Sequence, residues 1–349
     1  MKRLTFLDVA RGIAALAVLF QHAGESTLIL VKYISENFIQ IGQFGVALFF
    51  IVSGYVIPFS AQKQGSVRVF WSGRFFRLYP AYWFVIALFL ISGIAGLHHK
   101  IPVFSPWDYF ANLTMLYWLN GSSYLLGVFW SLKFELTFYI IISLLIPLGS
   151  NRVSAYYFHF AISAITVILS IKQKMDSGVF GSYGLYYLAL MFYGWSLHDT
   201  KDKEGSVLKA MVSTAVQTLL ALTVGKLAFG TAEVNYSSFG SNSLVPMIGA
   251  WVGAIIVFLV FRYKSEIKWH ASLVYLGVIS YSIYLVHGPI IYIIRNFVEN
   301  KALSFSLSIL LSIVAAKYIY EFIETPAMKL GKYVSGSRSK IKDLNGSFN

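Results

Sequence analysis

Long apolar stretches dominate this chain and decide what it can fold into. Charged residues are only 12% of the total, about half the ~25% of soluble domains, which leaves too little polar surface for a soluble enzyme. A helix needs ~20 mostly apolar residues to cross a bilayer. Ten stretches approach or reach that length, and the sequence therefore predicts an all-α polytopic membrane protein with about ten transmembrane helices, at 5–24, 41–59, 78–97, 129–148, 153–170, 183–198, 207–230, 244–261, 272–294 and 303–323.

The distribution of basic residues predicts the orientation of these helices. With a cytoplasmic N-terminus, 18 of the 28 Lys and Arg residues fall in inner segments and 6 in outer ones. Inner segments of membrane proteins carry such an excess, so both termini are expected in the cytoplasm. The bias also accounts for the net charge of +13 without a nucleic-acid partner.

The domain organisation is expected to be simple. Residues 1–330 read as one membrane domain, and residues 331–349 as a flexible, basic, cytoplasmic tail. The segment 108–119 is too short and polar to span. The chain has no cysteine, which excludes disulfides and thiolate chemistry. No phosphate-binding loop or nucleophile elbow is present, and the pair His98-His99 lacks a third metal ligand, so no metal is predicted.

Ionisable residues inside a membrane are costly and therefore mark functional sites. The first stretch carries Asp8, Arg11 and His22. Eleven residues correspond to about three helical turns plus ~20°, so Arg11 and His22 share a helix face and lie ~16 Å apart along the axis. Asp8 is three residues from Arg11 and can pair with it. A structural salt bridge and a hydrogen-bonded core histidine would produce the same pattern.

Arginines also collect at the inner mouth of the third stretch. Arg74 and Arg77 share a face and form a fork suited to phosphate, although an ordinary positive-inside anchor would look alike. Pro80 suits the first turn of the helix that follows.

Acidic and imidazole groups occupy the later stretches. Glu135 lies two residues from Lys133, too close for a simple helical pair, and is expected to find its partner on another helix. His287 follows a Tyr-rich run in the outer half of the ninth stretch. Glu321 and Glu324 precede Pro326, which is expected to end the last helix.

Five motifs follow one another along the chain. They are Leu7-Asp8-x-x-Arg11-Gly12 with His22; Gly45-Val46-x-x-Phe49-Phe50-Ile51-Val52-Ser53-Gly54-Tyr55; Arg74-x-x-Arg77-Leu78-Tyr79-Pro80; Trp130-Ser131-Leu132-x-x-Glu135-x-x-Phe138-Tyr139; and Ser280-Tyr281-x-x-Tyr284-Leu285-x-His287. In these motifs and in their order, the chain resembles the acyltransferase-3 family of integral membrane acyltransferases from residue 5 to about 326.

The resemblance implies ten membrane helices and transfer of an acyl group, usually acetyl from acetyl-CoA, to a hydroxyl of a surface glycan such as an O-antigen or exopolysaccharide. Some relatives modify macrolides or peptidoglycan. The chain looks like the single-domain form of this family, placed in the bacterial cytoplasmic membrane among its lipids.

The uneven distribution of charged residues across the membrane and the family resemblance suggest the same mechanism. Arginines gather near the cytoplasm, where acyl-CoA is found, and imidazoles lie deeper. His22 is expected to act as general base or, alternatively, as an acylated intermediate. Glu135 or His287 would orient His22 or bind the acceptor sugar. The predicted donor-binding residues are Arg11, Arg74 and Arg77, and the predicted catalytic residues are His22, Glu135 and His287.

A secondary transporter or proton-coupled permease is the competing hypothesis. Buried Asp, Glu, His and Arg residues suit ion pathways as well. Many transporters carry inverted repeats, which this sequence does not show.

Overall fold

A computed structural model describes residues 4–98, 104–118, 121, 123–148, 154–176, 182–200, 206–229, 236–237, 240–241 and 243–336. The chain is almost entirely helical there; one pair of two-residue strands, β1 (Tyr236–Ser237) and β2 (Gly240–Ser241), is antiparallel. The helices are α1 (Thr5–Gly24), α2 (Ile29–Asn37), α3 (Ile41–Gln64), α4 (Val67–Ile94), α5 (Pro106–Leu113), η1 (Gly127–Ser131), α6 (Leu132–Leu145), η2 (Ile146–Leu148), α7 (Ala155–Asp176), α8 (Ser182–Asp199), α9 (Ser206–Phe229), α10 (Leu244–Tyr263), α11 (Ala271–Val278), α12 (Ser280–Phe297), α13 (Lys301–Ile319), η4 (Tyr320–Glu324) and α14 (Thr325–Val334).

The all-α, multi-pass membrane architecture is confirmed. In the described part of the chain, eight helices are long and apolar enough to cross a membrane, and α11 with α12 makes a ninth span bent by 68°. Large apolar side chains on the outer faces are exposed, such as Ile94 (82%) and Leu144 (69%), which is the lipid-facing pattern of a membrane bundle. The remaining predicted stretch, 183–198, forms α8, which is rich in buried tyrosines.

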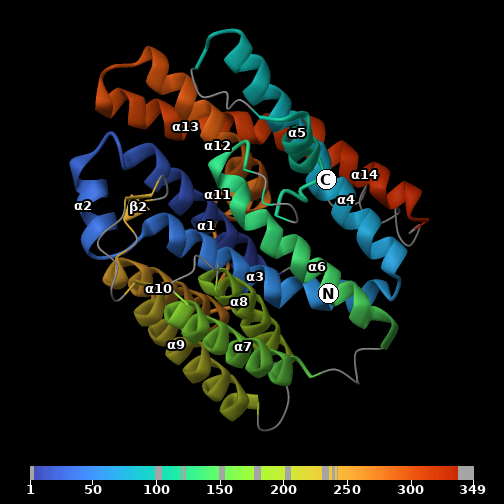
Figure 1. The fold of residues 1–349 in the computed structure, drawn as a ribbon. Coiled ribbons are helices and arrows are strands. Elements are labelled where there is room, and N and C mark those ends of the chain that lie inside the picture. Colours follow the sequence, from blue (N-terminus) through green and yellow to red (C-terminus); the bar gives the residue numbers. More distant parts are fainter. Residues whose placement is uncertain are drawn as a thin grey trace.

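Helices α1 and α3 form the centre of the bundle. Figure 1 shows them between α7–α10 on one side and α11–α13 on the other, and α1 contacts α3, α11 and α12 while α3 contacts α8 and α10. Glycines permit the closest approaches: a Cβ on Gly54 would strike the Met191 carbonyl oxygen, and one on Gly277 would strike that of Asp8. Small residues that bring backbones together in this way are typical of membrane helix packing.

Two prolines lie in places that the sequence did not predict. Helix α3 ends at Gly65, which adopts a left-handed conformation (φ 61°), and α4 begins two residues later. Pro80 is consequently inside α4, where a membrane helix tolerates it, and Arg74 and Arg77 lie on this helix. Pro326 does not end the last helix either. It lies in the first turn of α14, directly after the π-helical turn η4, and the helical run continues past it to Val334.

Short elements cover the ends of the bundle. The non-spanning segment predicted at 108–119 overlaps α5, whose N-terminus has a Ser105–Asp108 capping box. Between α1 and α3 lies the nine-residue helix α2. The predicted C-terminal tail overlaps the end of α14, and its residues 337–349 lie outside the described residues.

Candidate active site

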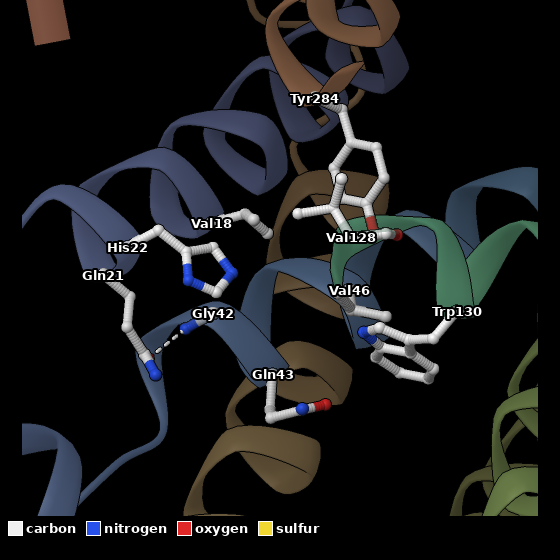
Figure 2. A pocket seen from close by; sticks show the side chains of 9 residues that line it. All are labelled: Val18, Gln21, His22, Gly42, Gln43, Val46, Val128, Trp130 and Tyr284. Atoms are coloured by element: carbon white, nitrogen blue, oxygen red, sulfur yellow. Dashed lines mark hydrogen bonds between the residues drawn. The ribbon is translucent and has the colours of Figure 1, made fainter. Parts of the chain in front are cut away.

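Two pockets lie along the central helices α1 and α3. Their α3 lining residues recur every three or four positions, so one face of α3 runs past both. The arginine pocket is lined by Arg11, Phe49, Ser53, Ile57, Arg74, Arg77, Leu78, Glu135, Tyr139 and Tyr281. The imidazole pocket, drawn in Figure 2, is lined by Val18, Gln21, His22, Gly42, Gln43, Val46, Val128, Trp130 and Tyr284.

The arginine pocket collects three guanidinium groups from two helices. The Arg74 guanidinium lies 5.5 Å from the ring centroid of Phe70 and 5.4 Å from that of Tyr139, and it donates to Ser60 Oγ at 3.3 Å. The Nε atoms of Arg11 and Arg74 are buried without a hydrogen-bond partner. Buried donors of this kind are normally satisfied, so the pocket is prepared for an additional acceptor.

Carboxylates balance part of this positive charge. Glu135 accepts a hydrogen bond from Tyr139, one turn later on its own helix, and it also interacts electrostatically with Arg11 on α1 and Arg77 on α4, the partners on other helices that the sequence predicts. Arg77 interacts electrostatically with Glu135 and with Glu324, and Glu324, 1% exposed, accepts from Ser282 Oγ at 2.9 Å. The π-helical turn that carries Glu324 thus brings a buried acid close enough to interact with Arg77.

His22, which lines the imidazole pocket, stacks against a second histidine from another helix. The rings of His22 on α1 and His287 on α12 stack with centroids 5.4 Å apart and planes inclined by 20°. His287 Nδ1 lies 3.1 Å from the Ile283 carbonyl oxygen. A carbonyl only accepts, so Nδ1 carries the proton and the neutral ring keeps Nε2 as an acceptor. That Nε2 is buried without a hydrogen-bond partner.

Amide side chains fix the helix ends around His22. Gln21 Oε1 accepts from the Gly42 N–H at 2.5 Å (Figure 2), and Gln21 Nε2 donates to Gln40 Oε1 at 2.6 Å. The N-terminus of α3 is thereby tied to the C-terminal turns of α1. Gln43 Oε1 accepts from the hydroxyl of Tyr187 at 2.5 Å, and the side chain of Gln43 faces the same pocket.

Arg295 makes a polar contact with the His22 segment, and the sequence did not predict this role for it. Its Nη2 donates to the carbonyl oxygen of His22 at 2.5 Å and to that of Ala23 at 3.4 Å. The last carbonyls of a helix have no intrahelical donor, and a cation there also complements the helix dipole. The sequence places Arg295 at the end of an apolar stretch, where it resembles an ordinary interfacial arginine.

The predicted site residues therefore separate into two groups. Arg11, Arg74 and Arg77 come together with Glu135 in the arginine pocket, and His22 meets His287 at the imidazole pocket. Glu135 does not line the pocket of His22. Lys133 turns away from both pockets; its Nζ lies 4.9 Å from the Phe134 ring centroid and 3.5 Å from the Tyr124 hydroxyl.

Comparison with known proteins supports an assignment to a family. The chain is 26% identical, over 95% of its length, to a Staphylococcus aureus (strain COL) protein named provisionally as an O-acetyltransferase. It is 26% identical over 94% of its length to the acyltransferase MdmB of Streptomyces mycarofaciens, and 23% identical over 97% to the peptidoglycan O-acetyltransferase OatA of Listeria monocytogenes.

The lengths of these relatives differ. The match covers 92% of MdmB but only 58% of the staphylococcal protein and of OatA, so the chain spans little more than half of those two. No solved structure matches. The family described as "Acyltransferase domain" matches residues 4–321, which contain both pockets. The chain therefore belongs to this acyltransferase family, the one that its five motifs resemble.

Proposed function

We propose that this protein is a membrane-bound O-acyltransferase that moves an acyl group, most simply acetyl, from cytoplasmic acyl-CoA to a hydroxyl of a cell-surface glycan. The observation that carries the proposal is the pairing of a three-arginine pocket with a pocket lined by His22, both along one face of α3. The names of the relatives, acyltransferase and O-acetyltransferase, support the same reaction class.

The arginine pocket would hold the phosphates of acyl-CoA. Guanidinium groups bind phosphate through charge-assisted, bidentate hydrogen bonds, and the unsatisfied Nε atoms of Arg11 and Arg74 are donors available for such contacts. Arg11 and His22 are ~16 Å apart along α1, about the length of the pantetheine arm. A donor anchored by its phosphates therefore reaches the imidazole pocket with its thioester.

His22 would act as general base on the acceptor. Its imidazole accepts the hydroxyl proton while the oxygen attacks the thioester carbonyl carbon; the C–S bond then breaks and the proton passes to the departing CoA sulfur. His287, stacked on His22, holds the ring in place. Glu135 would act at a distance, by keeping the guanidinium groups of Arg11 and Arg77 in position.

The acceptor side has the chemistry of a saccharide site. Trp130 and Gln43 reach into the imidazole pocket opposite His22 (Figure 2). An aromatic ring offers an apolar surface with a polar edge, and the amide offers donors and an acceptor, which together suit the faces and hydroxyls of a sugar. We therefore place a glycan, either an O-antigen or exopolysaccharide chain or its lipid-linked saccharide precursor, on this side.

The proposal sets the cellular context of the reaction. The protein would lie in the bacterial cytoplasmic membrane, bind acyl-CoA from the cytoplasmic side and bind its glycan at the imidazole pocket. Family membership favours this function over the secondary transporter that buried ionisable residues also suggest.

Purified protein in lipid nanodiscs tests the proposal directly. With acetyl-CoA and a lipid-linked saccharide, we expect release of free CoA that depends on the saccharide, and a saccharide heavier by one acetyl group in mass spectrometry. Absence of both acetyl-CoA binding and CoA release, together with solute-driven proton movement in proteoliposomes, would favour the transporter instead.

A further inference from the structure

The arginine and imidazole pockets are separated by two aromatic rings, Phe49 on α3 and Tyr284 on α12. The rings stack with centroids 6.5 Å apart and planes inclined by 23°. Phe49 lines the arginine pocket and Tyr284 lines the imidazole pocket. The ring pair therefore stands at the junction of the two pockets.

The lining residues show that the junction is short. On α3, Val46 faces the imidazole pocket and Phe49 faces the arginine pocket. On α12, Tyr281 lines the arginine pocket and Tyr284 the imidazole pocket. Three residues of helix rise ~4.5 Å, so both helices pass from one pocket to the other within about one turn.

The two rings are held differently. The Tyr284 hydroxyl donates to the Val128 carbonyl oxygen at 2.7 Å and lies 2.7 Å from Ser131 Oγ, so its position is fixed at the far end. Phe49 has no polar atom in its side chain and is half-buried. Rotation of Phe49 breaks only dispersion contacts, whereas displacement of Tyr284 would leave a buried hydroxyl without partners. Displacement of Phe49 therefore costs less than displacement of Tyr284.

The imidazole pocket, on the Tyr284 side of the ring pair, is small and has one apolar wall. The imidazole pocket has a volume of about 20 Å³, close to that of one water molecule. Val18, Val46 and Val128 form its apolar wall. Such a wall accepts a methyl group far more readily than a longer chain, because an interior packed at this density responds to every added methylene.

We propose that Phe49 and Tyr284 form a constriction through which the acyl thioester must pass, and that Phe49 selects the acyl group by its size. The inference rests on the proposed function. The closed ring pair also separates the thioester from water on the outer side until the acyl group has entered. Removal of the Phe49 ring would then both relax the choice of acyl group and admit water.

A size series at position 49 tests the constriction. Phe49→Leu and Phe49→Ala should raise the ratio of butyryl to acetyl transfer by about tenfold or more, the effect expected when a methylene-sized barrier is removed. Both should also raise hydrolysis of acetyl-CoA in the absence of acceptor. Phe49→Trp should lower acetyl transfer while acetyl-CoA binding is retained.

Phe44→Leu is the matched control, because Phe44 lies on the same helix but faces Gly253 of α10; it should keep the wild-type acyl preference. An unchanged butyryl-to-acetyl ratio and unchanged hydrolysis in Phe49→Leu, or wild-type acetyl transfer by Phe49→Trp, would overturn the constriction. Wild-type protein that neither binds nor consumes acetyl-CoA would instead refute the proposed function itself, so the two failures are distinguishable.

Discussion

The arginine pocket and the imidazole pocket are built on the same two central helices, yet they hold their polar groups in different ways. Cations and carboxylates crowd the first, where Glu135 and Glu324 offset the guanidinium charges while two Nε donors stay unsatisfied. Amides and the imidazole of His22 line the second, and the amides make hydrogen bonds to neighbouring segments. The contrast supports the division of labour that we propose, in which the first pocket would bind the charged donor and the second would transfer a proton.

The orientation of the protein in the membrane is the strongest test of this comparison between the two pockets. The arginine pocket is expected to open to the cytoplasm and the imidazole pocket to the outside. The chain has no cysteine of its own, so single cysteines report their side without interference. Asn37, at the end of α2, and Lys268, between α10 and α11, are both exposed.

In intact cells, an impermeant maleimide should label Asn37→Cys fully and Lys268→Cys only after the membrane is opened. The reverse pattern would place the imidazole pocket inside and break the proposed path of the donor.

Loss of the His22 base should be the largest catalytic effect. His22→Gln retains a hydrogen-bonding side chain but not a base, and a lost general base costs ~10²–10⁴ in rate. Acetyl-CoA binding, measured by calorimetry, should persist. The wild-type rate should rise with pH as the imidazole loses its proton, since only the neutral ring accepts one, and this ionisation should vanish in the variant.

His159→Gln is the control, because His159 is also a buried histidine but contacts Gln217 on α9, outside both pockets. Equal turnover in His22→Gln and the control, at equal thermal stability, would remove His22 from the mechanism.

The arginine pocket should respond in binding rather than in chemistry. Each charge-assisted contact contributes ~1.5–3 kcal/mol, so loss of one weakens acyl-CoA binding by about 10- to 100-fold. Arg74→Lys should suffer as well, because an ammonium cannot reproduce a planar fork stacked on aromatic rings. Equilibrium binding of acetyl-CoA to Arg74→Ala, Arg74→Lys and the Arg74/Arg77 double variant measures this.

Arg68→Ala serves as reference, since Arg68 lies on the same helix and is exposed. If the double variant binds acetyl-CoA as tightly as Arg68→Ala does, the two arginines are only membrane anchors.

The smallest effect on activity is expected for Arg295, which contacts the backbone of the His22 segment and lines neither pocket. Arg295→Met removes the donor to the His22 and Ala23 carbonyls and the favourable charge at the end of α1, worth ~1–2 kcal/mol. We expect kcat to fall about 5- to 30-fold while acetyl-CoA binding is unchanged. Arg295→Lys should recover part of the loss. A fall in donor binding with unaltered kcat would assign Arg295 to the donor instead.

Local periodicity explains which features could be predicted from the chain alone. The apolar stretches and the shared face of Arg11 and His22 follow from 3.6 residues per turn, and both residues line pockets on the central helices. The same reasoning sent Glu135 to partners on other helices, which are Arg11 and Arg77, but it overlooked the hydrogen bond from Tyr139, four residues later on the same helix. Pro80 was misplaced because a proline preference for first turns is weaker than the continuity of a membrane-embedded helix.

Apolar length and charge bias, read from the sequence by itself, determined that this chain is a multi-pass helical membrane protein, and the order of its motifs pointed to its family. Only the tertiary structure decided which helices meet. The stack of His22 on His287, the contact of Arg295 with the end of α1 and the ring pair of Phe49 and Tyr284 each join residues more than 200 positions apart. Such contacts depend on how helix faces pack against one another, and no periodicity within a single helix records which face its neighbour presents.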